Sequence, residues 1–170
     1  MANDDQSGRV ELIHVAGRGG EPMRPVDRIR VISGIGIEGD RYAIGLGRFS
    51  TDGGSGRALT LVEAEVLESL RASLGIDLQP GEVRRNVTTR GIALNALVGK
   101  RFRIGGVLCQ ATRLCEPCKY LEDLLAKPTS SSQCTGQGAV TLWSQQPFFK
   151  AENSCGKGML PIAEQATHCT

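Results

Sequence analysis

The strongest constraint on this chain is the shortness of its apolar segments, which glycine repeatedly interrupts. The sequence has 170 residues, of which 22 are glycine. Strands need about 4–8 residues of alternating or apolar character, whereas helices need longer periodic segments. The pattern therefore predicts strands over residues 9–15, 25–33, 87–90, 101–104 and 107–112. Gly105 and Gly106 separate the last two and predict a hairpin turn.

One helix is predicted over about 60–74. Thr60 can cap its first turn, and Glu63 three residues later would complete a capping box. Gly75 is a natural stop. The residues with helical spacing are Leu67, Leu70 and Leu74.

These elements predict a mainly β fold, barrel-like rather than built from βαβ repeats. Gly34, Gly36 and Gly39 satisfy the GxGxxG spacing of dinucleotide sites after a predicted strand. Such a site also needs a helix directly after the third glycine. The residues that follow show no helical period, so turns between strands are the better interpretation.

Length and charge narrow the functional classes. A chain of 170 residues is expected to form one domain with its own core. Its net charge of +2 predicts no binding to a nucleic acid polymer or to a membrane surface. The first residues are polar and no run of about 18 apolar residues occurs. We therefore expect a cytoplasmic protein, whose six cysteines are free, ligating or reactive rather than disulfide-bonded.

The most reactive thiol is expected at Cys118, which directly follows Pro117. Proline stiffens the backbone that presents this thiol. Arg113 and Lys119 lie close in sequence, and nearby positive charge favours the thiolate that ligates metals or attacks substrates. Cys115 precedes Cys118 by three residues, and a resolving thiol, a second sulfur site and a core residue all stay open for it. For Cys118 itself, the alternative is an inert buried thiol.

Two polar segments after turns are candidate anion-binding sites. One contains Asp40 and Arg41, and the other contains Arg84, Arg85 and Asn86. Arginine suits bidentate capture of phosphate and carboxylate groups. Solvated charges at 84–85 and a turn-stabilising ion pair at 40–41 stay open as alternatives. Two further residues, Cys109 and His14, are expected to be structural.

Three segments in order resemble the MOSC family, the domain named after the C-terminus of molybdenum cofactor sulfurase. They are Gly36-Ile-Glu-Gly-Asp-Arg-Tyr42, Pro80-Gly-Glu-Val-Arg-Arg-Asn-Val-Thr-Thr-Arg-Gly91 and Leu114-Cys-Glu-Pro-Cys118. The segment 99–105 is similar to the family's strand before the cysteines. The resemblance covers residues 9–128, and it implies a strand-rich, barrel-like MOSC-type domain with a few helices.

The resemblance also implies a cofactor. MOSC proteins bind the molybdenum-pterin cofactor (molybdopterin) or handle its sulfur, and Cys118 matches the cysteine that ligates molybdenum in reductase members. Cys118 is thus the expected catalytic residue and metal ligand, since molybdenum accepts soft thiolates. The expected cofactor-binding residues are Asp40, Arg41, Arg84, Arg85, Asn86 and Arg90. Pyridoxal phosphate is not expected on this chain, because the sulfurase carries it on a separate domain.

The implied activity is reduction of N-hydroxylated compounds, including hydroxylamino-purines, or sulfur transfer. The partners would be a small-molecule substrate and either a redox partner protein or a cysteine desulfurase. Two alternatives stay open. One is a metal-free sulfur-carrier module with a persulfide on Cys118, and the other is a thiol oxidoreductase that uses Cys115 and Cys118.

The resemblance ends after Pro128. Residues 129–170 have few charges and no clear period, which is typical of a disordered or poorly packed tail. The family continues with valine, histidine, arginine, alanine and glycine, and the codons of residues 133–138 can encode that series in a shifted frame. We hypothesise a frameshift near codon 128, which would remove or replace the closing strand. A gene whose shifted frame lacks the series would disprove it.

Overall fold

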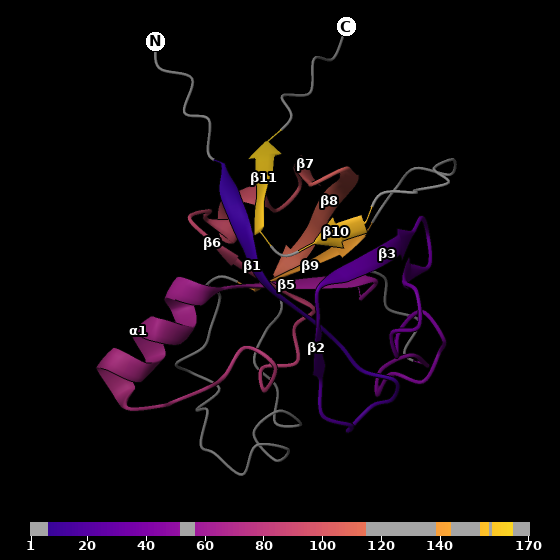
Figure 1. The fold of residues 1–170 in the computed structure, drawn as a ribbon, viewed down its shortest axis with the longest axis horizontal. Helices are drawn as coiled ribbons and strands as arrows, with labels where there is room; N and C mark the ends of the chain where they lie inside the picture. The colour runs from indigo at the N-terminus through magenta and orange to yellow at the C-terminus, as the bar shows by residue number, and fades with distance from the viewer. Residues whose placement is uncertain (1–6, 52–56, 115–138, 144–153, 157, 165–170) are drawn as a thin grey trace, which may run out of the picture.

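The computed structural model describes residues 7–51, 57–114, 139–143, 154–156 and 158–164. They form a strand-rich fold with one α-helix beside the sheets (Figure 1). The strands are β1 (Gly8–Val15), β2 (Arg24–Val26), β3 (Arg28–Ile32), β4 (Gly36–Ile37), β5 (Leu59–Glu63), β6 (Val87–Arg90), β7 (Arg101–Ile104), β8 (Val107–Leu114), β9 (Ala139–Trp143), β10 (Ser154–Gly156) and β11 (Gly158–Glu164). The helix is α1 (Ala64–Leu74), and a short 3-10 helix, η1, spans Leu94–Leu97.

The larger sheet has the strand order β11-β7-β8-β9-β5-β6-β1-β2. β11, the first strand in this order, also pairs with β1, which is next to the last strand. Strands near the two ends of the order are therefore hydrogen-bonded to each other. This arrangement confirms the mainly β, barrel-like prediction. β5 and β6 run parallel and are connected through α1, which lies outside the sheet (Figure 1).

The strand predicted over 25–33 is two strands in the structure. The chain bends at Asp27, and β2 pairs with β1 whereas β3 pairs with β4 and β10 in a second sheet. The bend lets one alternating segment serve two sheets. The glycine segment 34–39 contains the short strand β4, and turns rather than a helix follow it, as expected from the lack of helical period after Gly39.

The predicted start of the helix is wrong. Thr60 lies within β5, and α1 begins at Ala64 after Glu63, whose side chain makes no capping hydrogen bond. β5 is buried between β6 and β9, so tertiary pairing overrides the local capping signal. The predicted stop is confirmed, because Gly75 adopts a left-handed conformation with φ 65°.

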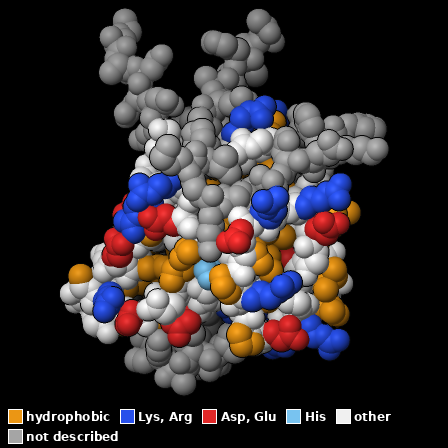
Figure 2. Space-filling view, viewed as in Figure 1, with side chains coloured by type: hydrophobic (Ala, Val, Ile, Leu, Met, Phe, Trp, Pro, Cys, Tyr) orange, Lys and Arg blue, Asp and Glu red, His pale blue; other side chains and the backbone are white. Residues whose placement is uncertain are grey.

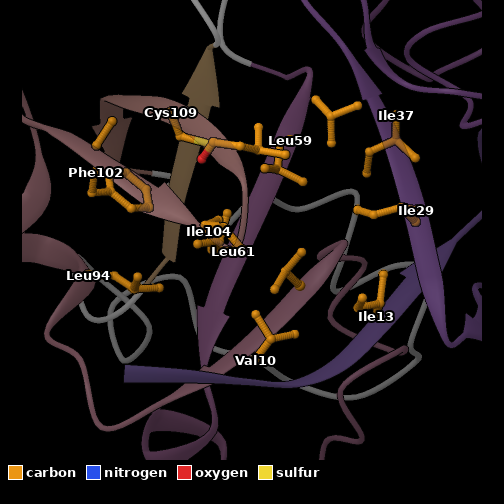
Figure 3. Packing of buried hydrophobic residues seen from close by; sticks show 14 of the residues in the cluster. Val10, Ile13, Ile29, Ile37, Leu59, Leu61, Leu94, Phe102, Ile104 and Cys109 are labelled. Atoms are coloured by element: carbon orange, nitrogen blue, oxygen red, sulfur yellow. The ribbon is translucent and has the colours of Figure 1, made fainter. Parts of the chain in front are cut away.

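The main core fills the space enclosed by the strands. Alternate residues of β5, β7 and β8 point into it, including Leu61, Phe102 and Ile104 (Figure 3). Cys109 belongs to the same cluster, as expected for a structural cysteine (Figure 3). Period-two patterning of short strands therefore accounts for this core.

A second, smaller apolar cluster fixes the helix against the outer face of the sheet. Its buried members are Val62, Leu67, Leu70, Leu78 and Val83. The two helical leucines come from the periodic series seen in the sequence. Leu74, the third of that series, is 43% exposed, because it lies in the last turn.

The segment after residue 128 contributes three strands among the described residues. β9 pairs with β5 and β8, β10 pairs with β3, and β11 pairs with β1 and β7. The strands described in this segment are paired, which differs from the expectation of a disordered or poorly packed tail. β9 reads Ala-Val-Thr-Leu-Trp, whose β-branched and aromatic residues suit a strand. The frameshift hypothesis stays a prediction.

A membrane-crossing helix would need a long apolar stretch, and none of the described helices has one.

A buried threonine in β6 gives a test of the packing. Thr88 is 1% exposed, and its Oγ1 has no hydrogen-bond partner among the described residues. Burying an unsatisfied hydroxyl costs about 1–3 kcal/mol. We therefore expect Thr88→Val to leave the free energy of unfolding unchanged or to raise it by about 1 kcal/mol in urea titration.

The matched control for Thr88→Val is its neighbour on β6. Thr89 is also buried, but its Oγ1 donates a hydrogen bond to the carbonyl of Val62 at 3.3 Å. Thr89→Val should lower the free energy of unfolding by about 1 kcal/mol. An equal loss in both variants would contradict the assigned hydrogen bonds.

Candidate functional site

The two described segments that carry polar site candidates meet in a buried network. Asp40 and Asn86 are 46 positions apart, and the Nδ2 of Asn86 donates to the Oδ2 of Asp40 at 3.1 Å. Asp40 is 1% exposed and Asn86 is fully buried. Such isolated polar groups are costly to bury unless they are hydrogen-bonded, so the network must hold together as a unit.

Asp40 is the acceptor at the centre of this network. Its Oδ2 accepts hydrogen bonds from the backbone N–H of Ala16 at 3.2 Å and from the Nη1 of Arg41 at 3.1 Å. Its Oδ1 accepts from the backbone N–H of Tyr42 at 3.2 Å. The carboxylate thus joins the end of β1 to the turn that follows β4.

Arg41 is buried and forms an ion pair with Asp40. Its Nη2 donates to the backbone carbonyl of Arg84 at 3.1 Å. Its guanidinium also lies over the ring of Tyr42, 4.9 Å from the ring centre. The turn-stabilising ion pair left open by the sequence is therefore present, and it reaches across to the second segment.

Asn86 completes the network on the other side. Its Nδ2 donates to the carbonyl of His14 at 3.2 Å, and its Oδ1 accepts from the Oγ1 of Thr60 at 2.8 Å. The sequence around Thr60 predicts a helix cap, and no sequence signal indicates this hydrogen bond to Asn86. The remaining backbone groups are also used, since Asn86 N donates to Thr60 and His14 N donates to the carbonyl of Asn86.

Arg84 and Arg85 differ in burial. Arg84 has φ 58°, the left-handed region that residues other than glycine rarely adopt. It is 7% exposed, and its guanidinium donates to the backbone carbonyls of Glu21 and Arg18. A solvated charge is therefore wrong for Arg84. Arg85 is half-buried.

Arg90 lies at the far end of β6 from Asn86. Strands rise about 3.3 Å per residue, so about 13 Å separates the two Cα positions. The Arg90 guanidinium binds Glu11 and Glu68 and lies 4.0 Å from Glu65. Its hydrogen bond lowers the pKa of the Glu68 carboxyl. The structure therefore groups Arg90 with carboxylates of β1 and α1 rather than with Asp40.

Acidic side chains around the start of α1 also hold the segment that follows β6. Glu63 Oε1 accepts from the backbone N–H of Leu94 at 2.7 Å, and Glu65 Oε1 accepts from that of Gly91 at 2.8 Å. Burial raises the pKa of the Glu63 carboxyl above its usual 4.5, with a smaller contribution from the nearby Glu65 charge. The hydrogen bond from Leu94 acts in the opposite direction.

The raised pKa of Glu63 predicts a pH-dependent variant. Because the folded protein holds the Glu63 proton more tightly than the unfolded chain does, ionisation costs stability at neutral pH. Glu63→Gln keeps the acceptor for Leu94 and removes this cost, so we expect the Tm at pH 7 to rise by about 1–2 °C.

Thermal unfolding across a pH series checks the origin of that rise. The advantage of Glu63→Gln should shrink as pH falls through the folded pKa of Glu63, because the wild-type carboxyl then becomes protonated too. An advantage that is constant from pH 7 down to pH 4 would contradict the assignment.

The cysteines with proposed chemistry, Cys115 and Cys118, lie outside the described residues, as does Lys119. In the part of the chain that the structure describes, no group of three or more His, Cys, Asp or Glu side chains could hold a metal ion. Charges of both signs surround a central hydrophobic area on the face shown in Figure 2. On this face, anion binding would therefore depend on individual arginines rather than on a broad basic area.

Comparison with known proteins gives one family and several related folds. The family model described as the MOSC domain matches residues 48–152. The crystal structure of the YuaD protein from Bacillus subtilis has a TM-score of 0.69 at 16% identity, covering 93% of this chain and 94% of that chain. No curated protein sequence matches.

Two further structures share the fold. YiiM from Geobacillus stearothermophilus has a TM-score of 0.68 at 17% identity, covering 94% of this chain and 75% of that chain. YiiM from Escherichia coli has a TM-score of 0.59 at 20% identity, covering 94% of this chain and 70% of that chain.

Proposed function

This chain belongs to the MOSC domain family, and from that membership we propose that it binds the molybdenum cofactor and acts in a reductase or a sulfur-transfer system. The observation that carries the proposal is the contact between Asp40 and Asn86. Two segments that resemble the family, far apart in sequence, meet there in one buried network. A common role of both segments at one cofactor site would account for their meeting in this network.

The described residues include arginines whose positive charge suits the anionic part of such a cofactor. The pterin of the cofactor ends in a phosphate, which arginines bind well. Arg85 is half-buried on the segment that resembles the family, and we propose that it contacts the phosphate. We propose that Asp40, Arg41, Arg84 and Asn86 support that contact from inside the fold. Arg90 lies apart and is a weaker candidate.

Cys118 remains the proposed metal ligand and catalytic residue. When bound, the cofactor would supply a molybdenum centre that exchanges electrons with the substrate. Reduction of an N-hydroxylated compound breaks its N–O bond, consumes two electrons and two protons, and releases an amine and water. The electrons would come from a redox partner protein, and the reaction is proposed for the cytoplasm.

The test is elemental and pterin analysis of the full chain purified from a host that makes the cofactor. The proposal expects molybdenum and pterin in amounts comparable to the protein, and loss of molybdenum in Cys118→Ser. Cys109→Ser is the matched control, because Cys109 is buried in the core. Cyanide-releasable sulfur without metal would instead support the sulfur-carrier alternative, and a reversible disulfide between Cys115 and Cys118 would support a thiol oxidoreductase.

A further inference from the structure

The outer face of β7 carries two arginines. Phe102 and Ile104 of this strand are buried in the main core. Because successive strand residues point to opposite faces of a sheet, Arg101 and Arg103 lie on the outer side of β7. Two positions along a strand are about 6–7 Å apart. These two positive charges therefore lie close together on one surface of the sheet.

β8 adds a third arginine to this side of the sheet. Its pairing with β9 has a register shift between Ala111 and Arg113, which accommodates one extra residue. Ala111 is buried in the core and Leu114 packs against it, whereas Arg113 is exposed. The shift thus keeps Arg113 on the outer side, with Arg101 and Arg103. We call these three arginines the basic face.

Within the described part of the chain, no carboxylate balances the basic face. Arg101 and Arg113 are exposed and make no ion pair there, and Arg103 donates to the carbonyl of Gly106 at 3.5 Å. The residues paired with these arginines on the neighbouring strands are all uncharged: Gln110, Leu108, Ala163 and Thr141. Three positive charges are therefore left for an outside anion to neutralise.

Other surface arginines of this chain do have carboxylate partners. Arg9 binds Glu11 at 3.1 Å, and Arg30 lies 3.9 Å from Glu38. Like charges on one face of a sheet destabilise it, and no ion pair among the described residues offsets this cost on the basic face. An anionic partner would offset it.

The position of the basic face indicates which anionic partner it suits. β8 ends at Leu114, and Cys118 follows four residues later in the sequence. Cys118 lies outside the described residues, but four residues of chain span at most about 14 Å. The proposed metal ligand is thus connected closely to the strand that carries Arg113. A protein that delivers electrons to the metal has to dock nearby.

We propose that the basic face is the docking surface of the electron-donor protein, and that this donor presents acidic side chains to it. The inference rests on the proposed function for the role of that partner. Complementary charge steers two proteins together and fixes their orientation. A nucleic acid strand suits the face less well, because its bases stack on aromatic side chains and the outer positions of β7 and β8 hold none.

The experiment measures, by fluorescence anisotropy, how the purified full chain binds a labelled peptide of glutamate and serine, as a probe of an acidic protein surface. At low ionic strength, Arg101→Gln and Arg113→Gln should each weaken binding about threefold, as expected for one exposed ion pair. The triple variant that also carries Arg103→Gln should lose at least about tenfold. Salt at about 0.15 M should weaken wild-type binding, because it screens exposed charges.

Arg28→Gln is the matched control. Arg28 is also an exposed arginine on a strand, but it lies on β3 in the second sheet, where it pairs with Gly156. The variant removes the same charge and should bind the peptide as the wild type does. An equal loss in Arg28→Gln and Arg101→Gln would show a response to net charge alone and overturn the proposal. Absence of wild-type binding, or tighter binding of an oligonucleotide of equal charge, would also overturn it.

The molybdenum and pterin content of the same samples separates this inference from the proposed function. Arg101→Gln and Arg113→Gln should keep the wild-type content, because the basic face is not the cofactor site. Peptide binding through the basic face in protein without molybdenum or pterin would contradict the cofactor assignment while supporting the docking of an acidic protein. Molybdenum-loaded protein whose variants all bind the peptide equally would support the cofactor and overturn the docking surface.

Discussion

Asp40→Ala is expected to lower the free energy of unfolding by about 3–5 kcal/mol, because it leaves the buried guanidinium of Arg41 without its ion-pair partner. It also removes the acceptor for the backbone N–H groups of Ala16 and Tyr42 and for the side chain of Asn86. All of these donors lie in the buried or half-buried network, where water cannot fully replace the lost carboxylate. Urea titration followed by circular dichroism measures the loss.

The matched control for Asp40→Ala is Glu38→Ala, two residues earlier. The Glu38 carboxylate is 56% exposed and lies 3.9 Å from Arg30, so removing it should change the free energy of unfolding by less than about 1 kcal/mol. Equal small effects in the two variants would mean that Asp40 is not buried in an ion pair. The network described above would then be wrong.

Phe102→Ala should cost a comparable amount, about 3–5 kcal/mol, for a different reason. Phe102 is the largest of the fully buried side chains in the described part of the chain, and it belongs to the main core (Figure 3). Its removal loses apolar burial and leaves a cavity that the paired strands β7 and β8 cannot collapse easily. The same urea titration checks it.

Two companion variants define the cause of that loss. Phe102→Leu keeps most of the volume and should cost less than Phe102→Ala. Arg101→Ala changes the preceding, exposed residue on β7 and should stay within about 0.5 kcal/mol of the wild type. A Phe102→Ala protein as stable as Arg101→Ala would place Phe102 outside the core.

Much of the fold could be predicted from local patterns. The strands at 87–90 and 101–104 were predicted with the bounds that β6 and β7 have, and those at 9–15 and 107–112 differ by at most two residues at an end. Glycines mark the ends of these strands. Gly91 follows the strand at 87–90, and Gly105 and Gly106 separate the strands at 101–104 and 107–112. The pattern was sufficient there because local turn chemistry and tertiary pairing agree.

The errors arose where tertiary pairing decides. Thr60 has the spacing of a helix cap, but its hydroxyl donates to Asn86, 26 positions away. The segment 25–33 alternates throughout, yet it divides at Asp27 because its two halves pair with different strands. No local signal distinguishes these outcomes, since the partners lie elsewhere in the chain.

The candidate site was predictable in composition and not in arrangement. Asp40, Arg41 and Asn86 could be named as polar residues after turns, and the structure brings them together. The sequence could not reveal that their polar groups bind one another and the backbone of Arg84, 43 positions from Arg41. Burial therefore makes these three residues part of the fold's own hydrogen-bond network.

The most direct measurement of the central claim is the amount of molybdenum per chain in protein purified from a cofactor-making host. The account predicts a nearly stoichiometric content in the wild type, retained in Cys109→Ser and lost in Cys118→Ser. Wild-type protein that contains neither molybdenum nor pterin, while the host's other molybdenum enzymes are loaded, would contradict it.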